Sequence, residues 1–220
     1  MPGRRITLRQ GLLWIFAVAL AARVGAAEDM AVDLFASGTL DGWVVDAAPP
    51  ARAKQTAAWS INDGLVHCAG GGYGFLRYDK LLADFVLSLE YRMSRGCNSG
   101  IGIRGVVFTG SLKTRPSFAG YELQILDDAG RKPDDHSSMA LYRYLAAKEN
   151  PTRPAGEWNQ LEVTCRGPHM RITLNGKVVQ DVDQSTDPQI KDKPTQGYIS
   201  LQNHGKPIDF RNVTLRQLDP

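Results

Sequence analysis

The sequence predicts an all-β domain built as a sandwich of two sheets. Short segments in which apolar and polar residues alternate recur along the chain, and residues typical of turns separate them. After residue 27, no segment has the three-to-four-residue apolar period of a long amphipathic helix. Many short strands with regularly spaced turns favour a two-sheet antiparallel sandwich over a helix-rich α/β arrangement. A chain of 220 residues is long enough to form one sizeable core.

The first 27 residues have the pattern of a cleaved signal peptide. Arg4, Arg5 and Arg9 precede an apolar run over residues 11–22, and small residues follow up to Ala27. The apolar run is too short to span a bilayer comfortably. We therefore expect cleavage after Ala27, a periplasmic or secreted location, and one domain over residues 28–220 with no stable membrane anchor. An uncleaved anchor is the alternative.

The charge balance of the expected mature chain argues against one class of partner. Residues 1–27 contain four arginines and no acidic residue, so the mature chain has 26 − 4 = 22 basic and 23 acidic residues, a net charge of about −1. A chain without an excess of positive charge lacks the electrostatic footprint of nucleic-acid-binding proteins. We therefore expect no nucleic-acid partner.

Three cysteines, Cys68, Cys97 and Cys165, follow the expected leader. In an oxidising compartment one disulfide and one free thiol are compatible with this number, and the sequence does not select the pair. Cys165 falls on the apolar side of its alternating segment, so we expect it to be buried as a small hydrophobic residue. The spacing of cysteines and histidines is not that of a zinc site.

The strands follow one another at short intervals after a Pro/Ala-rich connection over residues 47–58. Two hairpins are indicated by Asn62-Asp63-Gly64 and Asn175-Gly176, each of which separates two apolar segments. Residues 70–74 form a glycine-rich loop, for which a phosphate-binding role is not expected. The predicted strands are residues 59–61, 65–68, 84–93, 98–104, 120–127, 139–145, 161–166, 170–174, 177–179, 197–205 and 210–218.

Segments 98–104 and 120–127 carry the pattern that points to a functional surface. In segment 120–127, Glu122 and Gln124 alternate with apolar residues, and in segment 98–104 two glycines and Arg104 alternate with isoleucines. Glycine inside a strand often marks close approach by a ligand or by another part of the backbone. If these strands pair, Arg104, Glu122 and Gln124 share one polar face, and we expect this face to be the working surface.

Several short motifs occur in an order that resembles one bacterial family. The motifs are Leu40-Asp41-Gly42-Trp43, Asn98-Ser99-Gly100-Ile101 ending at Arg104, Tyr121 to Asp127, Trp158-Asn159, Leu174-Asn175-Gly176, and Leu201 to Gly205 with Phe210-Arg211-Asn212. Over residues 32–218 the chain resembles the 3-keto-disaccharide hydrolase domain, also described as a 3-keto-glucoside 1,2-lyase / 3-keto-2-hydroxy-glucal hydratase domain. The resemblance implies a concanavalin A-like jelly roll with a sugar-binding concave sheet, and action on glycosides already oxidised at C3.

The chemistry that the resemblance implies needs one base, one acid or electrophile, and a donor to an enolate. A 3-keto group acidifies the C2 proton, so a base can start elimination of the C1 substituent, and addition of water completes a net hydrolysis. We assign Glu122 or His204 as the general base or acid. Arg104 is expected to steady the enolate oxygen or to grip a pair of hydroxyls.

Five further residues are candidates for binding the sugar. Asn98, Gln124 and Gln202 would position hydroxyl groups, and Tyr142 would stack on the sugar ring. Asp127, at the end of its strand, would orient Arg104 or bind a cation. No cofactor or metal is required by this scheme, and a calcium ion at Asp127 is the alternative.

Each of these assignments has a simpler alternative. Glu122 and Arg104 could form a cross-strand ion pair on a solvated sheet, His204 could cap the turn at Gly205, and Tyr142 could belong to the core. At the level of function, the alternatives are a non-catalytic carbohydrate-binding module and a protein-interaction sandwich. An arginine, a carboxylate and a histidine on one face favour the enzyme.

Overall fold

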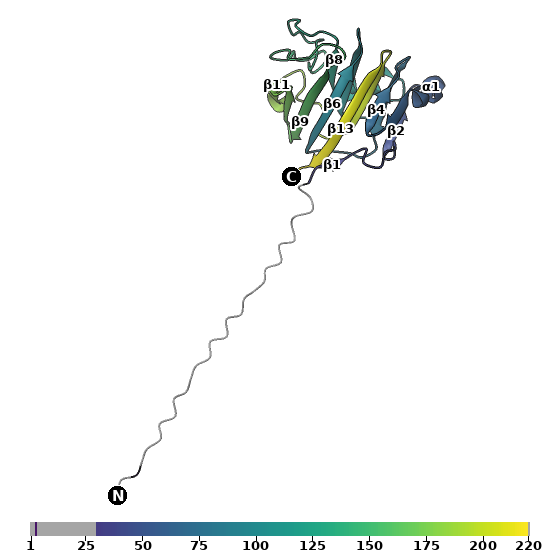
Figure 1. The fold of residues 1–220 in the computed structure, drawn as a ribbon. Helices are drawn as coiled ribbons and strands as arrows, with labels where there is room; N and C mark the ends of the chain where they lie inside the picture. The colour runs from purple at the N-terminus through teal and green to yellow at the C-terminus, as the bar shows by residue number, and fades with distance from the viewer. Residues whose placement is uncertain (1–2, 4–29, 220) are drawn as a thin grey trace.

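The structure is a computed structural model that describes Gly3 and residues 30–219, and it confirms the all-β sandwich (Figure 1). Two antiparallel sheets contain all the long strands of the described chain. The predicted signal peptide lies outside the described residues, apart from Gly3. In the part of the chain that is described, no helix has the length and the apolar character needed to cross a membrane.

The larger sheet has eight strands and faces the viewer in Figure 1. Its order is β11-β10-β9-β6-β13-β4-β3, and the short strand β1 pairs with β13. All of its neighbours are antiparallel. The strands are β1 (Val32–Asp33), β3 (Trp59–Asn62), β4 (Leu65–Cys68), β6 (Phe85–Met93), β9 (Trp158–Arg166), β10 (His169–Leu174), β11 (Lys177–Asp183) and β13 (Ile208–Gln217).

The smaller sheet has five strands in the order β2-β5-β12-β7-β8. The strands are β2 (Trp43–Asp46), β5 (Tyr73–Tyr78), β7 (Asn98–Gly105), β8 (Tyr121–Leu126) and β12 (Tyr198–His204). Leu76, Ile101, Leu123 and Leu201 point from this sheet into the core. Because side chains alternate along a strand, the residues between them lie on the outer face of the smaller sheet, which carries the candidate site described below.

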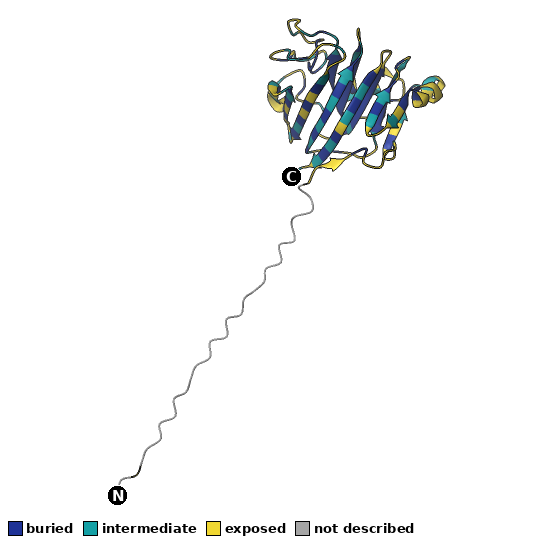
Figure 2. Ribbon diagram, viewed as in Figure 1, coloured by how far each residue is buried: buried dark blue, intermediate teal, exposed yellow. Residues whose placement is uncertain are grey.

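The core lies between the two sheets and follows the alternation of the sequence. In β6, Phe85, Leu87, Leu89, Tyr91 and Met93 are buried, whereas the residues between them are only partly buried. Figure 2 shows this as alternating bands along the strands of the larger sheet. Full burial of one such aliphatic or aromatic side chain stabilises the fold by about 1.5–3 kcal/mol. The prediction of a strand over residues 84–93 is confirmed.

Both predicted hairpin turns are confirmed by their backbone angles. Asp63 and Gly64 have φ values of 49° and 73°, and Asn175 and Gly176 have φ values of 49° and 79°. Two successive residues with positive φ are required in a type I′ turn, for which Asp-Gly and Asn-Gly are favoured. The turns therefore join β3 to β4 and β10 to β11 with the twist that the sandwich needs.

One predicted strand is wrong, and the connection before the first hairpin is partly helical. Residues 139–145 do not form a regular strand; this segment runs beside β8, where Tyr142 donates a backbone hydrogen bond to Glu122 and only isolated bridges form. The connection over residues 47–58 contains a 3-10 helix η1 (Pro49–Ala51) and a helix α1 (Arg52–Ala57). Strand β5 was not predicted, because the polar and apolar residues do not alternate there.

The segment between β7 and β8 covers the outer face of the smaller sheet. It contains η2 (Leu112–Thr114) and the short helix α2 (Pro116–Ala119), and Phe108 packs edge-on against Tyr73 and Phe75 of β5. A further 3-10 helix, η3 (Gln184–Thr186), follows β11. Because the segment between β7 and β8 covers Phe75, Phe75 and Leu76 are both buried although they point to opposite faces. This explains why β5 lacks the alternation of a half-buried strand.

All three cysteines are buried and free, so the disulfide that the sequence left open does not form in this structure. Burial raises the pKa of Cys68 to about 11 and those of Cys97 and Cys165 to about 12. Thiols with raised pKa values in apolar surroundings are poor nucleophiles. The cysteines therefore act as small core residues, as expected for Cys165.

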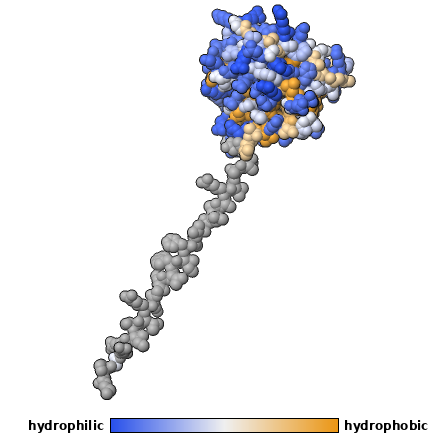
Figure 3. Space-filling model, viewed as in Figure 1, coloured by the Kyte–Doolittle hydropathy of each residue, from blue (hydrophilic) through white to orange (hydrophobic). Residues whose placement is uncertain are grey.

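The surface in front of the larger sheet is mainly hydrophilic (Figure 3). Hydrophobic side chains gather near the end where the described domain begins, and Met30, Val32 and Leu81 are exposed in this part of the chain. Met30 and Val32 line a hollow that is described below.

Candidate active site

A small pocket lies on the outer face of the smaller sheet, and we call it the pit. Its volume is about 60 Å³. Strands β5, β7, β8 and β12 supply its floor, and the segments after β7 and β8 supply its walls. The lining residues are Tyr73, Asn98, Arg115, Ser117, Glu122, Gln124, Tyr142, Gln202 and His204.

Glu122 is the central ionisable group of the pit. Its side chain is only 5% exposed, and its Oε1 atom accepts a hydrogen bond of 2.8 Å from Gln202 Nε2. Burial raises the pKa of the Glu122 carboxyl above its ordinary value, although hydrogen bonds from Gln202 and Ser117 and the charge of Arg115 act in the opposite direction. A buried carboxyl with a raised pKa inside a pocket is typical of a general acid or base.

Two glycines of β7 make room for the side chains that build the pit. A Cβ atom at Gly100 would lie 2.9 Å from Glu122 Cγ, and one at Gly102 would lie 2.9 Å from Pro116 Cβ. Because glycine has no Cβ atom, the Glu122 side chain can extend across β7, and α2 can pack closely against the sheet. The glycines predicted that some group approaches the backbone of β7 closely. In the structure, the groups that do so are side chains of the protein itself.

Three buried polar atoms in the pit lack a hydrogen-bond partner among the described residues. They are Gln124 Oε1, Gln202 Oε1 and Arg115 Nε. An unpaired buried polar atom costs about 1–3 kcal/mol, so native proteins rarely keep such atoms without a use. Two acceptors and one donor that line the same small space match the hydroxyl groups of a sugar.

An aromatic and cationic wall closes one side of the pit. The Arg115 guanidinium carbon lies 4.6 Å from the centre of the Tyr73 ring, and the His204 ring meets Tyr73 edge-on with centroids 5.0 Å apart. Partial burial and the positive charge of Arg115 lower the pKa of His204, so this residue at the rim is neutral at pH 7. Burial and the nearby Glu122 raise the pKa of Tyr73.

Arg104 does not lie in the pit, and this prediction is wrong. The register between β7 and β12 shifts at this position, and Arg104 has a φ of 53°, so the expected alternation ends before it. The side chain is fully buried on the interior side, where it donates to Gln184 Oε1 at 2.7 Å and to the Gly167 carbonyl at 2.5 Å. Arg104 therefore connects the smaller sheet to loops of the larger one.

Asp127 also lies outside the pit. Its Oδ2 atom accepts a hydrogen bond of 2.8 Å from the backbone N–H of Gly96, in the turn that leads into β7. Asp127 therefore fixes a turn and cannot orient Arg104, which corrects the predicted role.

The other predicted residues come together. Asn98, Glu122, Gln124, Tyr142, Gln202 and His204 all line the pit. The sequence analysis missed Tyr73, Arg115 and Ser117. The glycine-rich segment before Tyr73 and the Arg115-Pro116 step were visible in the sequence, but the loop that carries Arg115 shows no periodicity that assigns it to a face.

One cluster has the residue types of a metal site. Oxygen and nitrogen atoms of Asp134, Asp135 and His136 lie within 4.8 Å of one another, and all three residues are exposed. The His136 ring also meets Tyr142 edge-on at 4.8 Å. Asp135 and His136 already pair with each other through a hydrogen bond of 2.7 Å on the surface, which explains their proximity.

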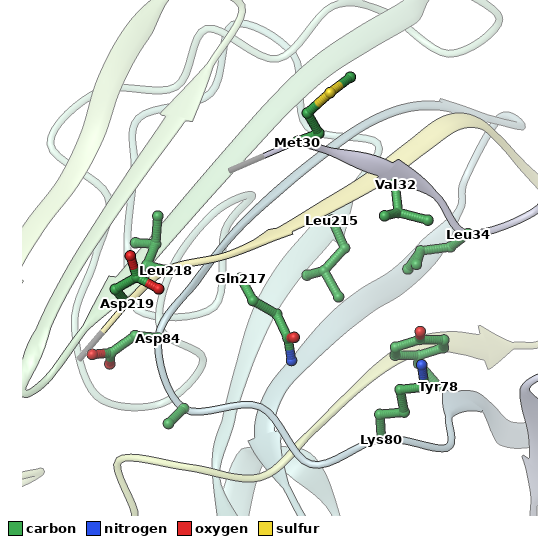
Figure 4. A pocket seen from close by; sticks show the side chains of 11 residues that line it. Met30, Val32, Leu34, Tyr78, Lys80, Asp84, Leu215, Gln217, Leu218 and Asp219 are labelled. Atoms are coloured by element: carbon green, nitrogen blue, oxygen red, sulfur yellow. The ribbon is translucent and has the colours of Figure 1, made fainter. Parts of the chain in front are cut away.

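A larger hollow of about 490 Å³ lies near the end of β5 that is opposite Tyr73 (Figure 4). Asp84 and Asp219 stand together at one end of it, and Lys80 and Tyr78 stand at the other. Asp84 is engaged by the backbone N–H of Gly167 at 2.7 Å. Among the described residues that line this hollow, no buried acid or base faces a donor, so the smaller pit is the better candidate for chemistry.

Comparisons with known proteins agree with a carbohydrate-active fold. The chain is 24% identical over 234 residues to a 3-keto-disaccharide hydrolase of Bacteroides thetaiotaomicron, covering 86% of this chain and 78% of the relative. A crystal structure from Parabacteroides distasonis, provisionally described as a glycosyl hydrolase, is 26% identical with a TM-score of 0.70, covering 86% of this chain and 100% of that one. A carbohydrate-binding module of Bacillus subtilis shares the fold at 15% identity, with a TM-score of 0.51 and coverage of 80% and 96%.

The sequence model of one family matches nearly the whole described domain. This family is described as the 3-keto-alpha-glucoside-1,2-lyase-like domain, and it matches residues 30–216. The match covers both sheets and every residue of the pit. This chain belongs to the family of 3-keto-alpha-glucoside-1,2-lyase-like domains.

Proposed function

We propose that the protein is an exported enzyme that hydrolyses 3-keto-disaccharides by elimination followed by hydration. The observation that carries the proposal is the buried Glu122 carboxyl, whose pKa is raised and which shares a small pocket with one unpaired donor and two unpaired acceptors. The relative from Bacteroides thetaiotaomicron, named a 3-keto-disaccharide hydrolase, supports the choice of substrate. The pattern of residues 4–27 supports export.

In the elimination half of the reaction, Glu122 takes the proton from C2 of the 3-keto sugar. The electrons of the C2–H bond form the C1=C2 double bond by way of the enolate, and the C1–O bond to the leaving sugar breaks. The departing oxygen receives the proton that Glu122 has taken, which restores the carboxylate. One carboxyl with a raised pKa can serve as base and then as acid, because it holds the proton that it has taken more readily than an ordinary carboxyl does.

In the hydration half, water adds to the resulting 2-hydroxy-3-keto-glucal. The water oxygen bonds to C1, and the proton that the water loses to His204 passes to the Glu122 carboxylate and from it to C2, so the sum of both halves is hydrolysis of one glycosidic bond. His204 at the rim is neutral because its pKa is lowered, so it can accept a proton from the incoming water. His204 is the alternative base for the first step.

Arg115 takes the role that Arg104 was expected to play. Its Nε–H is buried and unpaired, and its guanidinium lies over Tyr73 beside the pit. A fixed donor that meets negative charge as it develops on the C3 oxygen lowers the barrier without reorganisation. Gln124 and Gln202 would hold neighbouring hydroxyls through their unpaired Oε1 atoms.

One assay tests the proposal. Purified protein is incubated with a 3-keto-disaccharide and, separately, with the unoxidised disaccharide, and release of free monosaccharide is followed. Release from the keto form alone is the expected result, because only that form has an acidic C2 proton. Binding without release would instead indicate a carbohydrate-binding module, and release from both forms would indicate an ordinary glycosidase with two carboxylates.

A further inference from the structure

We propose that a second hollow beside the pit binds the leaving sugar and favours one that carries a carboxylate; the inference rests on the function proposed above. We call this hollow the outer groove. Its volume is about 340 Å³, and it shares Tyr73 and Arg115 with the pit. Its lining residues are Ala48, Ala51, Lys54, Gln55, Gly71, Gly72, Tyr73, Phe108, Gly110 and Arg115.

The size of the pit makes a second compartment necessary. The volume of the pit, about 60 Å³, lies well below the roughly 300–1,000 Å³ that is usual for small-molecule sites, so only part of a disaccharide can enter the pit. The rest of a disaccharide must lie outside it. The outer groove begins at the same two side chains, Tyr73 and Arg115, and its volume falls in the range of small-molecule sites.

The walls of the outer groove suit a second sugar ring. Phe108 and Tyr73 meet edge-on with ring centroids 5.7 Å apart and give the groove an aromatic side. Gln55 is fixed because its Oε1 atom accepts a hydrogen bond of 2.8 Å from Asn203 Nδ2. A Cβ atom at Gly72 would lie 1.8 Å from Gln55 Nε2, so glycine there leaves the amide in place.

The charge of the outer groove selects among leaving sugars. Lys54 and Arg115 are positive, and none of the residues that line the groove is acidic. A guanidinium pairs well with a carboxylate, and an exposed lysine adds long-range attraction. A leaving sugar in the form of an aldonic or uronic acid would therefore bind better than a neutral one.

The test compares three substrates that share the 3-keto-glucosyl unit: a methyl glycoside, a neutral disaccharide and a disaccharide whose leaving sugar is gluconate. Ala51→Phe fills the groove at a partly buried position that does not touch the pit. We expect it to lower kcat/KM for both disaccharides at least about tenfold and to leave the methyl glycoside within about twofold. An equal effect on all three substrates, or none, would overturn the groove assignment.

A second variant tests the charge preference without risk to folding, because Lys54 is exposed. We expect Lys54→Glu to lower kcat/KM for the gluconate substrate about fivefold or more relative to the neutral disaccharide. Lys177→Glu is the matched control, because Lys177 is exposed on β11 of the other sheet. An unchanged ratio in Lys54→Glu would overturn the preference, whereas failure of the unaltered protein to cleave even the methyl glycoside would overturn the proposed function itself.

Discussion

Glu122 on β8 reaches across β7 to Gln202 on β12, and its Oε1 atom lies 2.8 Å from Gln202 Nε2. The side chain crosses the intervening strand at Gly100, where a Cβ atom would lie 2.9 Å from Glu122 Cγ. The position of the proposed acid and base thus depends on a residue that does no chemistry. This relationship can be tested by adding one methyl group.

Gly100→Ala should move the Glu122 carboxyl and lower kcat at least about tenfold, because a displacement of the base by a fraction of an ångström disturbs proton transfer. Gly100 does not have a positive φ, so alanine introduces no backbone strain there. Gly105→Ala on the same strand is the matched control, since its Cβ atom would meet only ordinary contacts at 3.6 Å. Equal kcat values in the two variants, measured on a 3-keto-disaccharide, would show that Gly100 has no such role.

The pH dependence of kcat should report the ionisation of Glu122. Because the carboxylate is the form that takes the C2 proton, activity should rise with pH through a pKa that burial holds above 4.5. Glu122→Gln should lower kcat by at least about two orders of magnitude and abolish this dependence. The profile is measured between about pH 4 and 9 under saturating substrate. If Glu122→Gln keeps its activity and His204→Asn loses it, the base is His204.

Glu122 should also make stability depend on pH. Folding raises its pKa, so the native state favours the protonated carboxyl; the stability this contributes is fully present below the unfolded pKa and is lost as pH rises through the folded pKa. Urea unfolding of the unaltered protein and of Glu122→Gln should therefore show the unaltered protein losing stability relative to the variant as pH rises from about 4 to 8. A difference that stays constant over this range would mean that the carboxyl is not held at a raised pKa.

The alternation of side chains was sufficient to predict most of the sandwich and part of the pit. Glu122, Gln124, Gln202 and His204 sit in regular strands, where the two-residue period assigns each side chain to a face. The same rule failed at Arg104, because a shift in register and a positive φ turn its side chain inward. Arginine is not a residue type that marks a bulge, so the sequence could not reveal the shift in register at Arg104.

Contacts between distant segments explain what else the sequence could not predict. Arg115 reaches the pit because Pro116 packs on Gly102, and that contact depends on how the segment after β7 folds back over the sheet. Strand β5 escaped prediction for a related reason, since Phe108 of the same segment covers its outer face. Arg115 and Phe108 both lie in a loop segment without periodicity, where only tertiary packing assigns a side chain to a site.

Arg115 lines the pit, whereas Arg104 is buried in the interior, so the two arginines lead to opposite predictions. Arg115→Gln should lower kcat about 100-fold, the typical cost of removing one donor to an oxyanion, with little change in stability. Arg104→Met should lower the free energy of unfolding by about 2 kcal/mol, because its hydrogen bonds to Gln184 and Gly167 are lost and only Gln184 Oε1 keeps another donor, the Tyr121 hydroxyl.

Both variants are measured by urea unfolding and by kcat at a temperature where each is folded. Arg104→Met should keep kcat within about twofold, since Arg104 contacts no residue of the pit through its side-chain hydrogen bonds. Arg115→Lys keeps the charge but not the planar fork, so it should recover only part of the activity that Arg115→Gln loses. If Arg104→Met keeps full stability but has a low kcat, then Arg104 takes part in the reaction and Arg115 does not have the proposed role.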